Sequence, residues 1–350
     1  MCQEVNNMNS WERIKTVLDG GVPDRVPFYE LTINPKVIEG LNPGMSYYDF
    51  IDYWDFDAVG PNMTWDALGR VKWIDESKNI FVDRWGVTRR FLNDLLPIPI
   101  DWPIKEPKDF SRYKPPNPDE EPLLEKIEGL VSRFKGKRAT FILGRDGWTG
   151  SYMIRGMENL LVDMLTEPQL VHDIVRTQID YYKTVHRKAI AMGIDIIHLV
   201  DDYAYHSGPL MSPGLFEEFL APALGEAVSD IKANGAYCMK HTDGNIHKIL
   251  PSIVNTGIDG LGPLEPEAYM VLADIKKMHP NLTVMGNVSV DLLGVGNESD
   301  IEKAVKSLID STAAGGHYIM SSGNSIPFST LPGNLKTMIT ATKEYGVYSN

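Results

Sequence analysis

Ionisable side chains collect where the apolar runs of this sequence stop. His241 and Asp243 follow one such run, Glu265 follows a second, and Asp201 and Asp202 follow a third. Imidazole and carboxylate groups transfer protons or bind divalent metals in many active sites. The polar residues at the ends of all such runs are Glu30, Asn62, Arg145, Asp146, Asp201, Asp202, His241, Asp243, Glu265, Asn287 and Asn324. We expect these side chains to converge at one end of the fold.

Eight short apolar runs predict the strands that would carry these residues. They cover residues 26–32, 56–62, 139–146, 195–202, 236–243, 257–265, 283–290 and 317–324. Amphipathic stretches lie between the runs, and alternation of strand and helix favours a parallel sheet. Eight such units predict a closed α/β barrel of the (β/α)8 TIM type. The interior of such a barrel is packed with side chains, so its chemistry takes place at the C-terminal ends of the strands.

A single domain is expected to account for residues 1–350, because a (β/α)8 barrel takes roughly 250 residues plus insertions. Within it, an N-terminal helix is expected in the segment 1–25. Residues 81–121 are predicted to leave the barrel as an excursion that begins with an extra hairpin over 81–91. A long helix is predicted over 212–235, since a serine and a proline begin it and a glycine follows it.

The acidic balance and the low cysteine content limit the classes of partner. The formal net charge is -13, which repels nucleic acid backbones and anionic lipids. Cys2 and Cys238 are far apart in the sequence, so a disulfide scaffold is excluded. No apolar run reaches the length of about 18 residues that a membrane span needs, and the first residues lack the features of a signal peptide. We expect a cytoplasmic protein with no nucleic acid or membrane partner.

Each candidate also has a structural interpretation. His241 could be a hydrogen-bonded structural histidine. Asp201 and Asp202 point to opposite faces of a strand, so at most one of them faces the barrel axis, and we favour Asp202. Glu265 could instead stabilise the N-terminus of a helix predicted over 267–278.

Aromatic side chains near the strand ends are candidates for substrate contact. Trp148, Tyr152, Tyr203 and Tyr205 lie in or beside the segments that follow predicted strands. Aromatic residues more often belong to a core, but several at one rim would suit a flat, weakly polar molecule such as a methoxylated aromatic compound.

Six motifs occur in an order that resembles a known superfamily. They read SWERIKTVLDGGVPDRVPF, GSYMIRGMENLL, DDYAYHSGPLMSP, HTDGNI, MGNVSV and GGHYIMSSGNSIPFSTLPGNLKTMI. The chain thereby resembles the uroporphyrinogen decarboxylase superfamily over nearly its whole length. The resemblance implies a barrel that can form a homodimer. It also implies one of two chemistries: cofactor-free decarboxylation of a tetrapyrrole, or zinc-dependent methyl transfer to or from a corrinoid protein.

The decarboxylase branch matches this sequence at one of four positions. Its arginine-rich loop after the first strand corresponds to ELTINPKVIEG, which contains no arginine, although guanidinium groups are the natural partners of substrate carboxylates. Asn62 and Asn324 occupy the positions of an aspartate and a histidine of that branch, whereas Tyr152 matches its tyrosine. True uroporphyrinogen decarboxylation is therefore not expected.

The methyltransferase branch resembles this sequence with its thiolates replaced. Its His-x-Cys motif reads His241-Thr242-Asp243 here, and the position of its second cysteine falls on Asn324. Imidazole and carboxylate ligands leave a metal harder than thiolates do, and better suited to bind oxygen. The resemblance therefore implies that His241, Asp243 and Glu265, together with Asp202, hold a zinc ion with an open position.

The expected activity is that of an O-demethylase methyltransferase, which moves a methyl group from a small methoxylated or methylated substrate to a corrinoid protein. Asp202, His241 and Glu265 are the predicted catalytic residues. The predicted substrate-binding residues are Arg145, Trp148, Tyr152, Tyr203, Tyr205 and Asn324. Two alternatives remain: a metal-free decarboxylase, and a non-catalytic barrel that binds a corrinoid or a tetrapyrrole.

Overall fold

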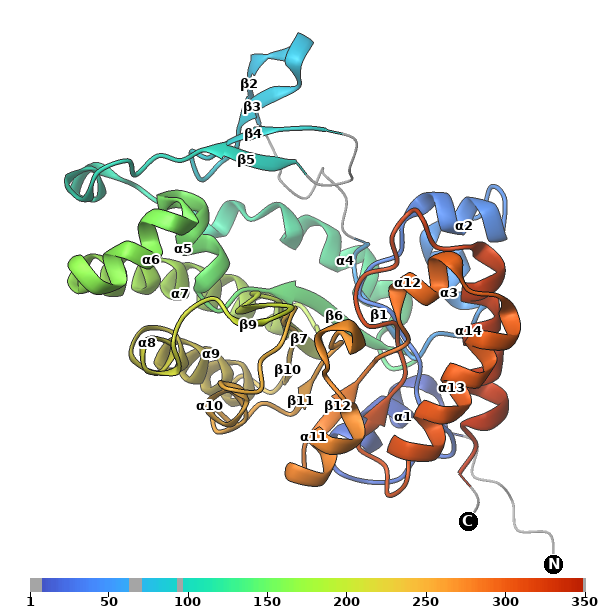
Figure 1. Cartoon of the computed structure of the whole chain (residues 1–350). Coiled ribbons are helices and arrows are strands. Elements are labelled where there is room, and N and C mark those ends of the chain that lie inside the picture. Colours follow the sequence, from blue (N-terminus) through green and yellow to red (C-terminus); the bar gives the residue numbers. More distant parts are fainter. Residues whose placement is uncertain (1–7, 63–70, 93–96, 349–350) are drawn as a thin grey trace, which may run out of the picture.

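Seven parallel strands form one curved sheet in the computed structural model, which describes residues 8–62, 71–92 and 97–348 (Figure 1). Cys2 and parts of the segments 1–25 and 81–121 lie outside the described residues. In spatial order the strands are β1 (Ala58–Val59), β6 (Ala139–Gly144), β7 (Ile196–Leu199), β10 (Tyr237–Lys240), β11 (Gly260–Leu261), β12 (Thr283–Met285) and β13 (Tyr318–Ile319). Each strand lies within one of the predicted runs, so the prediction of a parallel α/β fold is confirmed.

The first predicted strand, residues 26–32, forms isolated bridges in place of a regular strand. Phe28 pairs in parallel with Met320, directly after β13, and Ile33, directly after the predicted strand, pairs with Ile326. On its other side, the carbonyl of Phe28 accepts a hydrogen bond of 2.8 Å from the backbone N–H of Asp57, next to β1. The structure thus has a parallel sheet of seven strands, with a bridged segment in place of the first predicted strand.

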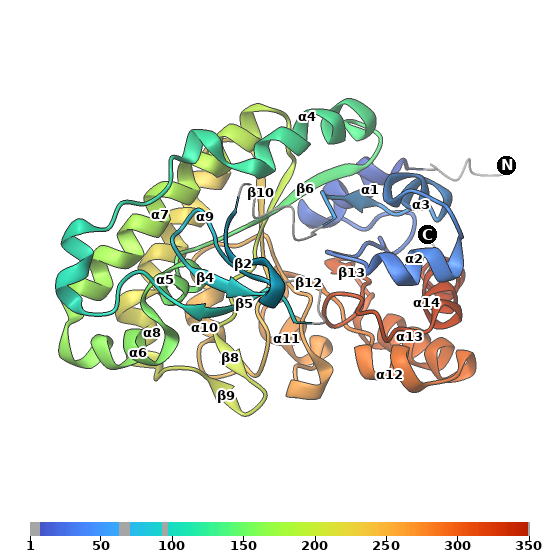
Figure 2. The same cartoon turned by 90° about the horizontal axis from the view of Figure 1, so that it is seen from above.

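Helices surround the strands when the molecule is seen from above (Figure 2). The continuous apolar runs of the strands fit this arrangement, since parallel sheets are buried on both faces. The helices are α1 (Ser10–Leu18), α2 (Pro35–Leu41), α3 (Tyr47–Tyr53), α4 (Pro122–Phe134), α5 (Trp148–Arg155), α6 (Met157–Thr166), α7 (Pro168–Ala191), α8 (Pro213–Phe219), α9 (Ala221–Ala233), α10 (Leu250–Val254), α11 (Leu272–Met278), α12 (Val290–Val295), α13 (Glu298–Thr312) and α14 (Pro332–Tyr345). Among the described residues, none of the helices is both long and apolar enough to cross a membrane.

Two predicted helices are shorter or more divided than the sequence suggested. The helix expected over 212–235 is two helices, α8 and α9, which meet at Leu220. Pro222 lies in the first turn of α9. Its missing N–H is tolerated there, but it could not donate the hydrogen bond that would continue α8 into α9. The helix expected over 267–278 is a short 3₁₀ turn followed by α11, because Tyr269 adopts a left-handed conformation between them.

The excursion between β1 and β6 contains a separate antiparallel sheet. Its strands are β2 (Lys72–Asp75), β3 (Ile80–Val82), β4 (Thr88–Arg90) and β5 (Ile98–Asp101), paired in that order. The hairpin expected over 81–91 corresponds to β3 and β4 at the centre of this sheet. The sheet, hereafter the antiparallel sheet, lies over one end of the seven-stranded sheet in both views (Figures 1 and 2).

Glu30 is a carboxyl group buried within the fold, next to β13. The backbone N–H and the hydroxyl of Ser322 donate hydrogen bonds of 2.8 and 2.6 Å to its two oxygens. Burial raises the pKa of Glu30 to about 8, although the hydrogen bonds from Ser322 oppose the rise. The unfolded chain loses this proton near pH 4.3, the ordinary pKa of a glutamate. The folded protein keeps it up to about pH 8.

We predict that the free energy of unfolding falls as the pH rises from about 5 to about 8, because the unfolded chain then binds fewer protons than the folded one. Glu30→Gln removes this titration and should give a flatter dependence, whereas replacing the exposed Glu128 of α4 by glutamine should not. Urea unfolding at several pH values measures the slope. An equal slope in the Glu30→Gln variant and the parent would contradict the prediction.

Candidate metal centre

His241 directly follows β10 and is held at the end of that strand by two hydrogen bonds. Its backbone N–H donates to the carbonyl of Leu199 in β7 at 2.8 Å. Its ring Nδ1 lies 2.7 Å from the carbonyl oxygen of Pro263, which can only accept, so Nδ1 carries the proton. In the neutral ring, Nε2 then keeps its lone pair, which is how a metal-binding histidine is normally oriented.

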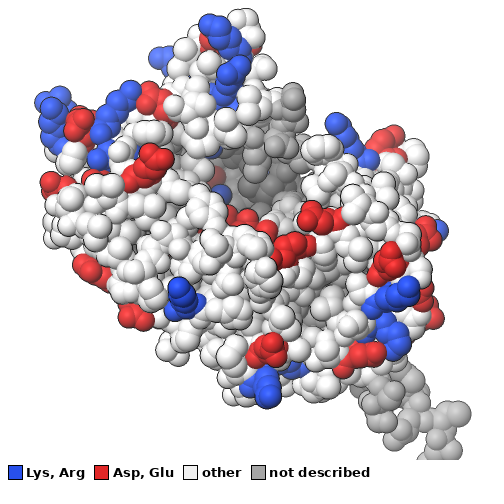
Figure 3. All heavy atoms as spheres, viewed as in Figure 1, with Lys and Arg blue, Asp and Glu red and all other residues white. Residues whose placement is uncertain are grey.

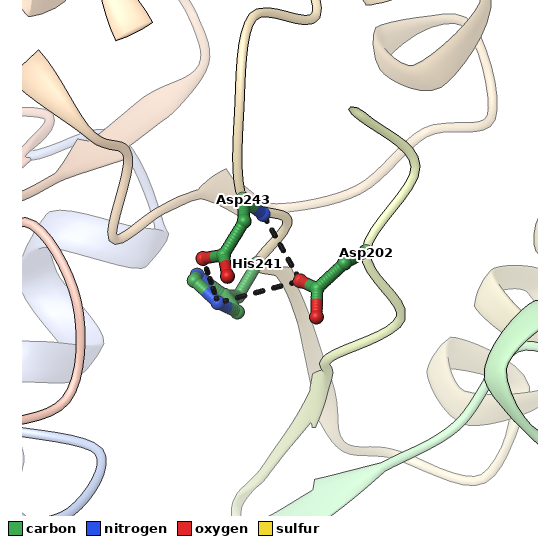
Figure 4. Close-up of side chains that lie close together, drawn as sticks. All are labelled: Asp202, His241 and Asp243. Atoms are coloured by element: carbon green, nitrogen blue, oxygen red, sulfur yellow. Dashed lines mark hydrogen bonds and ion pairs between the residues drawn. The ribbon is translucent and has the colours of Figure 1, made fainter. Parts of the chain in front are cut away.

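Two carboxylates stand beside that free nitrogen (Figure 4). His241 Nε2 is 3.2 Å from an oxygen of Asp243 and 3.8 Å from an oxygen of Asp202. The backbone N–H of Asp243 donates a hydrogen bond of 3.0 Å to the Asp202 carboxylate, which ties the end of β7 to the end of β10. One potential ligand atom from each residue lies within 4.8 Å of the other two. An imidazole and two carboxylates fit a zinc ion that keeps an open position for substrate.

The ionisation of these three groups is mutually dependent. Burial alone would lower the pKa of His241, but the hydrogen bond and charge of Asp243 and the charge of Asp202 raise it. Burial raises the pKa of Asp202, and the neighbouring Asp243 charge adds to the rise. Burial also acts to raise the pKa of Asp243, yet the hydrogen bond and charge of His241 lower it. The two carboxylates therefore favour a positive charge beside them, which either a proton on His241 or a bound cation can supply.

Glu265 lies beside this group and is connected to it through Asn324. The Asn324 amide donates to Asp243 at 2.7 Å and to Glu265 at 3.1 Å. The other Glu265 oxygen accepts a hydrogen bond of 2.8 Å from the backbone N–H of Gly244. Glu265 is thus not among the three residues grouped around His241 Nε2, and its role as a metal ligand stays a prediction.

The predicted substrate-binding residues are divided between the surface and the interior. Trp148 and Tyr203 have no exposed surface, whereas Tyr205 is 63% exposed. Tyr152 is partly buried, and its ring packs against that of Trp148 with the centroids 5.4 Å apart. Arg145 donates to the carboxylate of Asp201 at 3.1 Å. Burial favours a packing role for Trp148 and Tyr203, and the substrate contacts of all these residues stay predictions.

Asp146, one of the polar residues expected at the strand ends, forms a buried ion pair with Lys240, which was not predicted to lie at the site. Lys240 Nζ lies 2.7 Å from an oxygen of Asp146, and neither side chain has any exposed surface. The hydroxyl of Tyr203 donates to the other Asp146 oxygen at 2.6 Å. Burial raises the pKa of Asp146 to about 7, against the effect of Lys240. The signal in the sequence was a lysine within an apolar run, directly before His241.

The buried carboxylate of Asp201 pairs with the guanidinium group of Arg145. Burial opposes its ionisation, but the charges of Arg145 and Lys240 lower the pKa of Asp201 to about 2. Asp201 is therefore a paired interior group, and Asp202 is the member of the two that reaches His241.

The face shown in Figure 3 is hollowed between the antiparallel sheet and the rest of the molecule, and acidic side chains lie along the edge of the hollow. The fold and the site together define an α/β protein of the barrel type with a candidate metal centre at the C-terminal ends of its parallel strands. The family model described as uroporphyrinogen decarboxylase (URO-D) matches residues 84–345. The chain belongs to this family.

Two proteins of Methanosarcina mazei illustrate its relationships. A methylated-thiol–coenzyme M methyltransferase is 24% identical over 223 residues, which cover 63% of this chain and 58% of that relative. The chain thus matches well under two thirds of the length of this relative. The solved structure of a methyltransferase has a TM-score of 0.76 at 17% identity and covers 97% of this chain and 99% of its own. At that identity the structural likeness establishes the fold.

Proposed function

We propose that this protein is a zinc-dependent methyltransferase that moves a methyl group from a small methoxylated or methylated substrate to a corrinoid protein. The observation that carries the proposal is the placement of the Asp202 and Asp243 carboxylates beside His241 Nε2. The relationship to a methylated-thiol–coenzyme M methyltransferase supports the reaction class. Three nitrogen and oxygen ligands favour an oxygen-bound methyl group, as in an O-demethylase, over a thiol.

The residues of the candidate metal centre would have separate roles in the proposed reaction. A zinc ion held by His241, Asp202 and Asp243 would act as a Lewis acid on the substrate oxygen, where negative charge develops as the methyl group leaves. The Pro263 carbonyl keeps the His241 ring in place, and the Asn324 amide orients the Asp243 carboxylate. Glu265 is proposed as a fourth ligand or as a proton donor to the departing oxygen.

The transfer requires a nucleophile, which would be the reduced cobalt of the corrinoid on its own protein. The electron pair of the broken carbon–oxygen bond would stay on the oxygen, and cobalt(I) would supply the pair for the new bond to carbon. The hollow beside the antiparallel sheet (Figure 3) is the proposed approach for both substrate and partner. We also propose that the segment around Phe28 closes the ring as its eighth strand, because it is hydrogen-bonded on both sides.

Metal content and turnover of the purified protein test the proposal. We expect close to one zinc per chain, and transfer of methyl groups from methoxylated aromatic compounds to reduced cobalamin, measured by the absorbance change of the cobalt centre. Removal of zinc by a chelator should abolish the transfer, and added zinc should restore it. A metal-free protein that decarboxylates a porphyrinogen would instead support the decarboxylase alternative.

A further inference from the structure

Lys240, the last residue of β10, places an ammonium group where no solvent reaches it. Besides Asp146, its Nζ contacts the backbone carbonyl oxygen of Asp201, to which it donates a hydrogen bond of 2.7 Å. The ring of Tyr203 lies across it, with its centroid 4.1 Å from Nζ. Lysine is almost never fully buried unless it is paired, so these contacts must replace all the water that the ammonium has lost.

The contacts of Lys240 join the two backbones that carry the candidate ligands. The Asp201 carbonyl belongs to the peptide group that leads directly into Asp202, and Lys240 itself precedes His241. The hydrogen bond from the Lys240 ammonium therefore ties the backbone that leads into Asp202 to the residue that precedes His241. Asp146 holds that ammonium from the segment that follows a third strand, β6, and its own N–H donates to the Asp201 carboxylate at 3.2 Å.

Stability alone is a weak reason for such an ion pair. Replacing a buried pair by apolar groups of similar volume is often neutral or stabilising, because the loss of hydration offsets the attraction between the charges. Removing one partner is costly, because it leaves an uncompensated charge in the interior. The pair is thus better explained by the geometry that it imposes on the ends of β7 and β10.

We propose that Lys240 and Asp146 are positioning residues, which hold Asp202 at metal-binding distance from His241. The inference rests on the proposed metal centre and adds to it a buried support that touches neither metal nor substrate. Groups that orient metal ligands from behind typically account for about 10- to 100-fold in metal affinity.

Three variants separate positioning from stability: Lys240→Met, the double variant Lys240→Met with Asp146→Asn, and Arg13→Met. The double variant leaves no unpaired charge, and its asparagine oxygen can still accept from Tyr203. Arg13 forms a buried pair with Asp57 at 2.6 Å, before β1 and so at the opposite end of the strands. Zinc affinity is measured by competition with a chromophoric chelator, and the free energy of unfolding is measured on the metal-free proteins.

We expect Lys240→Met to lower both stability and zinc affinity. The double variant should regain stability but still bind zinc about 10- to 100-fold more weakly than the parent. Arg13→Met should lose stability and keep its zinc affinity. Parental zinc affinity in the double variant would overturn the positioning role and leave the proposed function intact, as would equal weakening of zinc binding in Arg13→Met. Failure of the parent protein to bind zinc would overturn both proposals.

Discussion

His241→Ala is expected to abolish zinc binding and methyl transfer while the fold is maintained. The imidazole contributes the only nitrogen among the three grouped residues. Its loss leaves the Asp202 and Asp243 carboxylates as the only members of the group that could hold a zinc ion. Because loss of a supporting group behind a ligand costs about 10- to 100-fold in affinity, loss of the ligand itself should exceed about 100-fold. Metal analysis after dialysis, together with chelator competition, measures the effect.

His247→Ala is the matched control, since His247 is an exposed histidine on the loop that follows the same strand. Its ring contacts the carbonyl oxygen of Tyr269 at 3.2 Å and lies outside the group of three. This variant should bind zinc as the parent does. If His241→Ala retained a full equivalent of tightly bound zinc, the candidate centre would be wrong.

Asp57→Asn is expected to destabilise the protein by about 3–5 kcal/mol, the usual cost of breaking a buried ion pair. The Asp57 carboxylate is fully buried and pairs with Arg13 at 2.6 Å and Arg25 at 2.8 Å. It also accepts a hydrogen bond of 2.8 Å from the backbone N–H of Phe28. The substitution therefore leaves two guanidinium groups partly uncompensated and weakens the attachment of the first segment to β1.

Asp55→Asn provides the comparison, because Asp55 pairs with Arg25 and Arg138 but is 53% exposed. Exposed pairs contribute about 1 kcal/mol or less, so the two variants should differ clearly in urea unfolding. Similar losses in both variants would show that burial of the Asp57 pair does not control its contribution.

The sequence predicted the strand framework because each strand is a short apolar run bounded by polar residues. It overestimated strand length, most clearly for 257–265, where β11 comprises only Gly260–Leu261. Strand ends depend on which backbone groups find partners across the sheet, and those partners lie far away in sequence. The same limit applies to 26–32, where Phe28 forms its bridge with Met320, almost 300 residues away.

The candidate site was predictable where local spacing determines direction. His241 and Asp243 are two residues apart and reach one another, as expected for alternate residues at a strand end. The position of Glu265 depends on Asn324, which is 59 residues away, and no local pattern encodes that contact. Lys240 was missed because a lysine in a sequence is normally taken as exposed. Only the folded chain brings Asp146 and the Asp201 carbonyl to it.

The antiparallel sheet has a consequence for how this protein can change. Its strands, β2 to β5, occur between β1 and β6 in the sequence, whereas the three grouped metal-site residues follow β7 and β10. The antiparallel sheet and the candidate metal ligands are therefore encoded by separate segments of the sequence. Mutations can accumulate in the segment of the antiparallel sheet, and alter which molecules are admitted, without disturbing the imidazole and carboxylates below. If the proposed methyl transfer is correct, exchange of this segment between relatives would change the methyl donor and leave the proposed metal ligands in place.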